Sequence, residues 1–183
     1  HQYEAIQAIN KSFSNRNEQR SGIVSIPTGG GKTYMAVYWI NSIIQHKKTK
    51  IIWFAQSFEL LNQAYLCMKE NLDPKLMIKR VSSEKDHYNI SDINDSDDII
   101  LITSQSAIKN ADSENAYSSF INKNKDNLVC ILDEAHHAPA YGFRNMIISL
   151  KEKSSNMWLL GLTATPTYTD ENRRGWLWII FEQ

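Results

Sequence analysis

Two kinds of hydrophobic pattern alternate along the chain. Five short runs are apolar at nearly every position, which is typical of strands buried on both faces of a parallel sheet. These runs are residues 22–26, 51–55, 99–103, 129–133 and 157–162. Between them lie stretches whose apolar residues recur every three or four positions, as on the buried face of a helix. These stretches are residues 4–13, 32–45, 58–69 and 143–151.

The alternation of strands and helices predicts an α/β domain with a doubly wound, mostly parallel sheet and helices on both faces. Residues 82–98 are polar and acidic, so we expect a solvated loop there. No repeat or linker divides the sequence, and we therefore expect residues 1–183 to form one domain. Near the end, Trp176 and Trp178 belong to an apolar cluster that predicts either an ordinary core helix or a helix that docks on another part of the protein.

The composition limits the partners and the compartment. The 20 Lys and Arg residues balance the 20 Asp and Glu residues, so any nucleic-acid site must be local rather than a basic coat. No apolar run approaches the ~18 residues of a membrane-spanning helix. The two cysteines are too few for a disulfide framework or a zinc site. Because the sequence begins without Met and shows no signal peptide, we expect a piece of a longer, cytoplasmic protein.

A glycine-rich segment joins the first predicted strand to the helix that begins near Lys32. It reads Ile26, Pro27, Thr28, Gly29, Gly30, Gly31, Lys32, Thr33. Such a loop can point successive backbone N–H groups at a phosphate, and the helix N-terminus adds its positive dipole end. We expect the Lys32 ammonium at the β- and γ-phosphates of ATP and the Thr33 hydroxyl on Mg²⁺. The alternative, a glycine-rich turn with an accidental Lys-Thr pair, explains the strand–helix junction less well.

Two adjacent carboxylates, Asp133 and Glu134, follow the apolar run 129–132. Placing them at the end of a buried strand costs repulsion and desolvation unless a cation and a substrate use them. We expect Asp133 to hold Mg²⁺ through water, and Glu134 to orient the water that attacks the γ-phosphate and to accept its proton. A strand that simply runs out into a polar loop is the alternative, and the phosphate loop elsewhere in the sequence argues against it.

Three segments together resemble motifs I, II and III of the DEAD/DEAH-box helicases of superfamily two. They are residues 27–33, residues 133–137 (Asp-Glu-Ala-His-His) and residues 161–166 (Gly-Leu-Thr-Ala-Thr-Pro). The doubled histidine and the Leu-Thr-Ala-Thr-Pro ending look most like the helicases of the type III restriction enzyme res subunit. The resemblance spans almost the whole chain and implies a RecA-like P-loop fold, ATP and Mg²⁺ as ligands, and ATP hydrolysis.

The same resemblance implies roles for further residues. Gln2 corresponds to the glutamine that reads adenine, and His136 to the histidine that links the ATP site with motif III; the role of His137 is left open. Thr163 and Thr165 correspond to the element that couples hydrolysis to strand movement, with two turn-capping hydroxyls as the alternative. Contacts with the nucleic-acid backbone are expected from Gln56, Ser57, Thr103 and Ser104. Ser57 and Ser104 each follow a predicted strand and open a helix, so helix N-caps are a compatible alternative.

The resemblance also predicts what the 183 residues lack. The family has two RecA-like lobes with ATP bound between them, and the second lobe supplies the arginine fingers. Arg173 and Arg174 stand in the wrong place for that role, so we expect the first lobe of a helicase or translocase on nucleic acid, with DNA favoured over RNA. Alone, this lobe should hydrolyse ATP very slowly and bind nucleic acid weakly. The rival hypothesis is a P-loop ATPase switch that acts on protein partners without nucleic acid.

Overall fold

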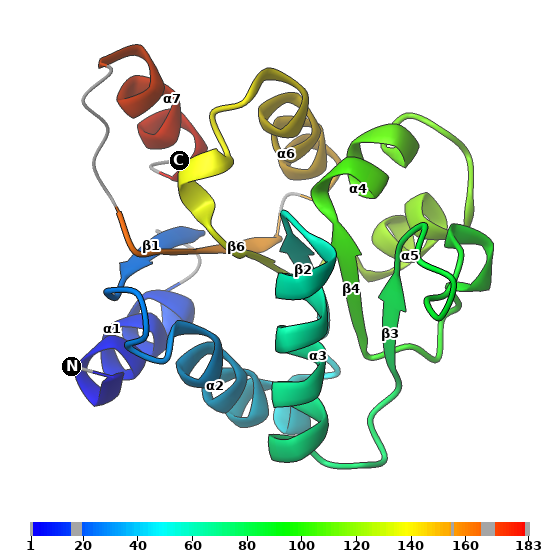
Figure 1. The fold of residues 1–183 in the computed structure, drawn as a ribbon, viewed down its shortest axis with the longest axis horizontal. Helices are drawn as coiled ribbons and strands as arrows, with labels where there is room; N and C mark the ends of the chain where they lie inside the picture. The colour runs from blue at the N-terminus through cyan, green and yellow to red at the C-terminus, as the bar shows by residue number, and fades with distance from the viewer. Residues whose placement is uncertain (1, 16–19, 155, 166–170, 182–183) are drawn as a thin grey trace.

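The computed structural model describes residues 2–15, 20–154, 156–165 and 171–181. Six strands form one sheet in the order β1-β6-β5-β2-β4-β3, and every neighbouring pair is parallel (Figure 1). The strands are β1 (Ser21–Ser25), β2 (Lys50–Ala55), β3 (Ile78–Val81), β4 (Ile99–Thr103), β5 (Leu128–Leu132) and β6 (Trp158–Thr163). The helices are α1 (Gln2–Ser14), α2 (Lys32–Lys47), α3 (Phe58–Asn71), α4 (Ser104–Asn110), α5 (Ala116–Asn124), α6 (Tyr141–Lys153) and α7 (Glu171–Phe181), with short 3₁₀ turns η1 (Ile90–Asp92) and η2 (Ala135–His137).

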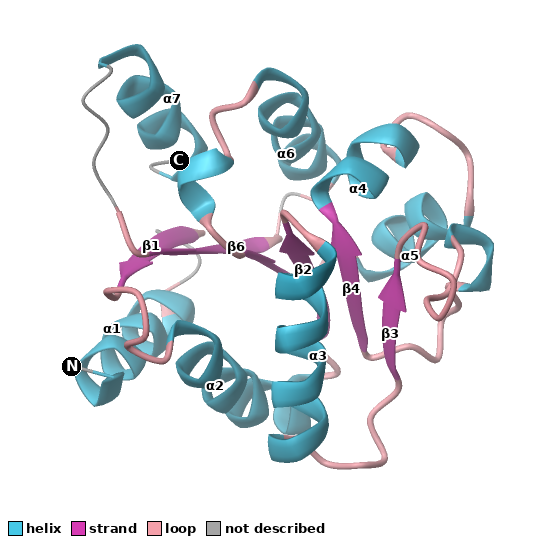
Figure 2. Ribbon diagram, viewed as in Figure 1, coloured by secondary structure: helices cyan, strands magenta, loops and turns pink. Residues whose placement is uncertain are grey.

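Helices cover both faces of the sheet, which confirms the predicted α/β architecture (Figure 2). One core joins α1, α2 and α3 to the sheet and contains the indole rings of Trp39, Trp53 and Trp158. The other joins α4, α5, α6 and α7 to the opposite face, around Phe54 and Phe120. Strands β2, β4, β5 and β6 are buried at almost every position, which explains why their sequences are continuous apolar runs rather than alternating ones.

The five predicted strands and four predicted helices are present, but the prediction of a solvated loop at residues 82–98 is wrong at Ser82, Ile93 and Asp97, which are buried. Asp97 is completely buried, and its carboxylate lies 3.1 Å from the Nζ of Lys79 on β3. The backbone N–H of Asn94 also donates to this carboxylate. The segment turns inward here because strand β3, whose four residues gave no clear apolar run, supplies the buried ammonium.

The apolar cluster near the end of the sequence forms α7. Its buried side chains, Leu177, Ile180 and Phe181, pack in the same core as α6, as expected for a core helix. Trp178 remains 55% exposed, so the helix also presents an aromatic outer face. Across the described residues, no helix combines the length and the apolar character that a membrane span requires.

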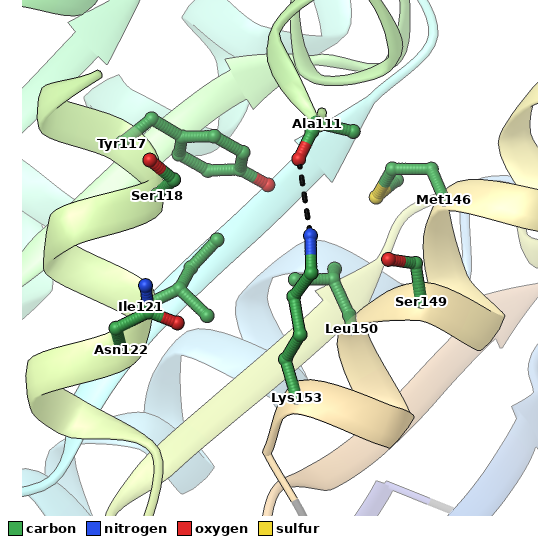
Figure 3. A pocket seen from close by; sticks show the side chains of 9 residues that line it. All are labelled: Ala111, Tyr117, Ser118, Ile121, Asn122, Met146, Ser149, Leu150 and Lys153. Atoms are coloured by element: carbon green, nitrogen blue, oxygen red, sulfur yellow. Dashed lines mark hydrogen bonds between the residues drawn. The ribbon is translucent and has the colours of Figure 1, made fainter. Parts of the chain in front are cut away.

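A small cavity of about 30 Å³ lies between α5 and α6 (Figure 3). Tyr117 lines it, and its buried hydroxyl has no hydrogen-bond partner within the described part of the chain. Burial raises the pKa of Tyr117 well above its ordinary value. Across the cavity, the Nζ of Lys153 donates to the carbonyl of Ala111 at 3.3 Å. None of the predicted site residues lines this cavity, so it is separate from the site below.

Candidate active site

The sheet topology brings the motif-bearing loops to one edge. In a parallel sheet all carboxyl ends lie on the same side, and ligands bind there in open α/β folds. Strands β1, β6 and β5 are consecutive neighbours in the sheet, although they are far apart in the sequence. The phosphate loop after β1, Thr163 at the end of β6 and Asp133 after β5 are therefore adjacent.

The phosphate loop depends on its glycines for backbone geometry. Gly29 and Gly31 have φ angles of 77° and 79°, which side chains with a Cβ rarely adopt. Gly31 is the N-cap of α2, so its left-handed conformation turns the chain into the helix. At Gly30 an added Cβ would lie 2.5 Å from the side chain of Ile26. The loop is thus closely packed, with the free N–H groups of the α2 N-terminus at its end.

Lys32 and Glu134 meet across the site. The Nζ of Lys32 lies 3.6 Å from one Glu134 oxygen, and both side chains retain some solvent access. Glu134 has φ 51° and ψ 55°, a left-handed conformation that is strained for a residue with a side chain. This backbone turn directs the carboxylate toward the phosphate loop rather than along the strand. Two predicted residues of the ATP site therefore already contact each other.

His136 connects this pair to β6. Its Nδ1 lies 3.2 Å from the second Glu134 oxygen and 3.1 Å from the Thr163 hydroxyl. The Thr163 hydroxyl donates to the carbonyl of Thr165 and accepts from the Thr165 N–H. Burial lowers the pKa of His136, with a further decrease from His137, so the ring favours its neutral form. Lys32, Glu134, His136 and Thr163 thus form one continuous chain of polar contacts.

Asp133 lies beneath this chain and is only 4% exposed. Its pKa is raised from 3.8 to about 6, first by burial and then by the adjacent Glu134 carboxylate, while the backbone N–H of Glu134 and the Lys32 ammonium oppose the shift. The carboxyl groups of Asp133 and Glu134 outnumber the single ammonium of Lys32, so this partly buried site carries an excess of negative charge. Carboxylate and hydroxyl oxygens are the hard donors that Mg²⁺ prefers, so the chemistry of Asp133 and of Thr33, in the first turn of α2, fits that cation.

Gln2 contacts the phosphate loop directly. Its Nε2 donates to the carbonyl of Gly30 at 2.8 Å, and a Cβ added at Gly31 would lie 2.5 Å from the same nitrogen. The described structure therefore joins α1 to the loop through this amide. Its predicted contact with adenine stays a prediction. A cavity of about 360 Å³ opens on the His136 side of the site and is lined by His136, His137 and Tyr141 among others.

The predicted nucleic-acid residues lie together at the ends of β2 and β4. The Nε2 of Gln56 donates to the Ser104 hydroxyl at 3.0 Å, and that hydroxyl donates to the carbonyl of Ala55 at 3.3 Å. Ser57 caps α3, as expected, by accepting from the N–H of Leu60. The interpretation of Ser104 as an N-cap is wrong. Thr103, the last residue of β4, caps α4 instead by accepting from the N–H of Ser106, because the helix begins at Ser104 itself.

The burial of these residues affects what they can contact. Thr103 is 5% exposed and Ser104 is 3% exposed, so the more accessible groups are Gln56 and Ser57.

A neighbouring network was missed by the sequence analysis, since it depends on β3. The Arg80 guanidinium donates to the side chain of Asn62 at 2.7 Å and lies over a tyrosine ring. No sequence motif predicts that the Arg80 guanidinium lies here, because its position depends on the pairing of β3 with β4.

Solved structures share this fold. The Hef helicase domain of Pyrococcus furiosus matches 98% of this chain with a TM-score of 0.69 at 20% identity, over 37% of its own length. A nuclease-deletion mutant of the Type ISP restriction-modification enzyme LlaGI, solved with a DNA substrate mimic, matches 91% with a TM-score of 0.65 at 17% identity, over 17% of its length. The UvsW helicase from bacteriophage T4 matches 91% with a TM-score of 0.63 at 18% identity, over 55% of its length.

Sequence relatives extend the comparison. "Putative helicase 22" of Sulfolobus islandicus filamentous virus (isolate Iceland/Hveragerdi) is 34% identical over 90% of this chain and 28% of its own length. The IIH helicase/translocase subunit XPB of Enterocytozoon bieneusi (strain H348) is 31% identical over 90% of this chain and 26% of its own length. The chain thus spans about a quarter of these curated relatives. The family described as type III restriction enzyme, res subunit, matches residues 1–168. Because that match covers most of the sequence, the chain belongs to the type III restriction enzyme res subunit family.

Proposed function

We propose that this chain is the ATP-binding lobe of an ATP-dependent helicase or translocase that acts on nucleic acid. The observation that carries the proposal is the contact chain from Lys32 through Glu134 and His136 to Thr163. It joins a phosphate-binding loop, a candidate base and the element that resembles motif III. The family membership and the two relatives named as helicases support the same assignment.

Each group has a defined task in this proposal. Lys32 and the backbone N–H groups of the phosphate loop bind the β- and γ-phosphates of ATP. Glu134 accepts a proton from the attacking water, and His136 holds the carboxylate through its Nδ1 contact. Mg²⁺, when bound at Thr33 and Asp133, neutralises charge on the phosphate oxygens. Thr28 and Gly29 complete the loop, and Gln2 fixes it from the side of α1.

Coupling to nucleic acid follows from the positions of Thr163 and of the β2 and β4 ends. A change in the charge near Glu134 alters the His136–Thr163 hydrogen bond, and β6 lies in the same sheet as the strands that carry Gln56 and Ser57. We propose that Gln56, Ser57, Thr103 and Ser104 contact the strand backbone, and that DNA is favoured over RNA. Helix N-termini at this edge suit phosphate oxygens and give no base specificity.

We further propose that this lobe needs a second RecA-like lobe. Phosphoryl transfer spreads negative charge over the γ-phosphate, and an arginine finger supplied from elsewhere contributes roughly 10³–10⁵ in rate in related enzymes. Within the described residues the cation at the phosphate loop is Lys32, so the isolated lobe should turn over ATP very slowly.

A steady-state ATPase assay on the whole protein tests the proposal. Single-stranded DNA, single-stranded RNA and no nucleic acid are compared at saturating Mg·ATP. Stimulation by DNA above RNA is the expected result. Turnover that neither nucleic acid changes would instead favour the rival function, a P-loop switch acting on protein partners. The 183-residue chain, assayed in parallel, should show little turnover with or without DNA.

A further inference from the structure

Gly161 on β6 lies against both α7 and η2. A Cβ placed on this residue would lie 2.7 Å from the Cζ of Phe181 and 2.9 Å from the Cβ of Ala135. Any larger residue would therefore have to displace one of them, because the core leaves no free space here. Two atoms that lie so close to one point are themselves neighbours. The Phe181 ring thus contacts the η2 turn where the end of α7 meets β6 (Figure 1).

Ala135 occupies a sensitive position in the candidate active site. It is completely buried, and it is the first residue of η2. Glu134 precedes it with the strained left-handed φ of 51°, and His136 follows it with an Nδ1 contact to the same carboxylate. Strand β5 ends just before, at Leu132, which pairs with Gly161 itself. A group that contacts Ala135 therefore acts on the residue that joins the candidate base to the histidine beside it.

Helix α7 is fixed to its neighbours at both ends of its described aromatic segment. The Nζ of Lys151 on α6 and the hydroxyl of Ser21 on β1 donate to the last two carbonyls of the helix. One turn earlier, the guanidinium of Arg144 on α6 lies 3.6 Å from the centre of the Trp176 ring. The side chain of Phe181 is only 6% exposed. These contacts hold the Phe181 ring in place from α6 and from β1.

We propose that Phe181 is a positioning residue for ATP hydrolysis. Its ring holds Ala135 against β6, and Ala135 in turn keeps Glu134 in the left-handed conformation that directs the carboxylate toward the phosphate loop. Phe181 lies outside the segments that resemble helicase motifs, and the family match to residues 1–168 ends before it. The inference rests on the proposed function, because it gives Phe181 a task in the hydrolysis that Glu134 promotes. The alternative is a role in core packing alone.

Hydrogen exchange in the nucleotide-free whole protein tests the contact itself. The N–H of His137 donates across the η2 turn at 2.9 Å, and the N–H of Asp133 donates to a β2 carbonyl at 2.9 Å, so the second amide is the internal reference. Phe181→Ala should speed exchange at His137 by roughly tenfold or more relative to Asp133. The control, Phe120→Ala, makes the same truncation in the same core, on α5, which packs against η1. It should leave the ratio of the two exchange rates unchanged.

Single-turnover hydrolysis in the whole protein tests the catalytic consequence. Phe181→Ala should slow the chemical step by roughly 10–100-fold but change ATP binding by less than about threefold, because a misplaced base affects the reaction and leaves the phosphate loop intact. Phe181→Leu refills most of the space and should recover most of the rate, and it also serves if Phe181→Ala does not fold. Phe120→Ala should keep the rate within about threefold of the unmodified protein. A similar loss of rate in Phe120→Ala and Phe181→Ala would reduce the effect to core packing and overturn the inference.

A combination with Glu134→Gln separates positioning from packing. If Phe181 acts through the Glu134 carboxylate, Phe181→Ala should slow the Glu134→Gln protein by less than about threefold, because groups that act as a unit do not contribute additively. The full loss in that background, or unchanged exchange at His137 in Phe181→Ala, would overturn the inference. A whole protein that hydrolyses no ATP would instead refute the proposed function, and the exchange at His137 would then decide by itself whether the ring holds the turn.

Discussion

Replacing Glu134 by Gln separates nucleotide binding from hydrolysis. The substitution keeps the shape of the side chain and one acceptor oxygen, but an amide cannot accept a proton from water. Loss of a general base reduces turnover by about 10²–10⁴, which corresponds to roughly 3–5 kcal/mol of barrier. Binding should be retained or become tighter. In the nucleotide-free chain the Glu134 carboxylate attracts the Lys32 ammonium at 3.6 Å, and the amide competes less with ATP for that cation.

The same variant changes the titration of Asp133. The pKa of this carboxyl is raised to about 6 first by burial and then by the negative charge of Glu134. Glu134→Gln removes the second cause, so the pKa should decrease while staying above 3.8. Because the raised pKa means that the folded state holds the proton more tightly, the free energy of unfolding falls as pH rises from about 4 to 6. The full shift corresponds to about 3 kcal/mol, and Glu134→Gln should reduce that loss.

Three measurements on the whole protein examine this reasoning together. Single-turnover hydrolysis reports the chemical step, titration with a fluorescent ATP analogue reports binding, and urea unfolding of the nucleotide-free protein between pH 4 and 7 reports the Asp133 titration. Glu152→Gln, an exposed substitution on α6 with the same change in charge, is the control. Turnover within tenfold of the unmodified protein would show that another group accepts the proton. Loss of binding would mean that Glu134 holds the cation rather than the water.

Three further substitutions probe other contacts. Lys32→Ala removes the ammonium beside the phosphate loop and should abolish productive ATP binding, as measured with the same fluorescent analogue; undiminished hydrolysis would contradict the assignment. Asp97→Asn leaves the buried Lys79 ammonium without its carboxylate and should lower the free energy of unfolding by about 3–5 kcal/mol in urea. Tyr117→Phe removes a buried hydroxyl that has no partner among the described residues and should raise the free energy of unfolding by roughly 1 kcal/mol, whereas a lower unfolding midpoint would reveal a partner.

The sequence predicts the parts of this fold that are governed by continuous burial. Strands β2, β4, β5 and β6 are recognisable because both faces are covered, so each reads as an unbroken apolar run. Strand β3 escapes detection, since it lies at an edge and its Lys79 and Arg80 serve a buried ion pair and a hydrogen-bond network. Helix α5 is also missed, because its nine residues contain a single short apolar repeat, Tyr117, Phe120 and Ile121, among polar ones.

The site shows the same division between local and distant information. The phosphate loop is predictable because its glycines and Lys32 are contiguous and its geometry is local. The contact of His136 with both Glu134 and Thr163 joins residues that lie 27 positions apart in the sequence, and only the neighbouring positions of β5 and β6 bring them together. The left-handed backbone of Glu134 has no sequence signal either, since that conformation usually favours glycine.

The strained turn at Glu134 explains how a carboxylate that follows β5 lies beside the phosphate loop. A carboxylate continuing straight from β5 would lie above its own strand, but the left-handed turn carries it to the phosphate loop, where Lys32 and His136 hold it from two sides. Such strain costs of order 1–3 kcal/mol and persists only where surrounding contacts compensate it. In the proposed function, an ATP phosphate replaces Glu134 at Lys32 and releases one of those contacts. We propose that the remaining contact, through His136 to Thr163, then carries the effect of nucleotide binding to β6.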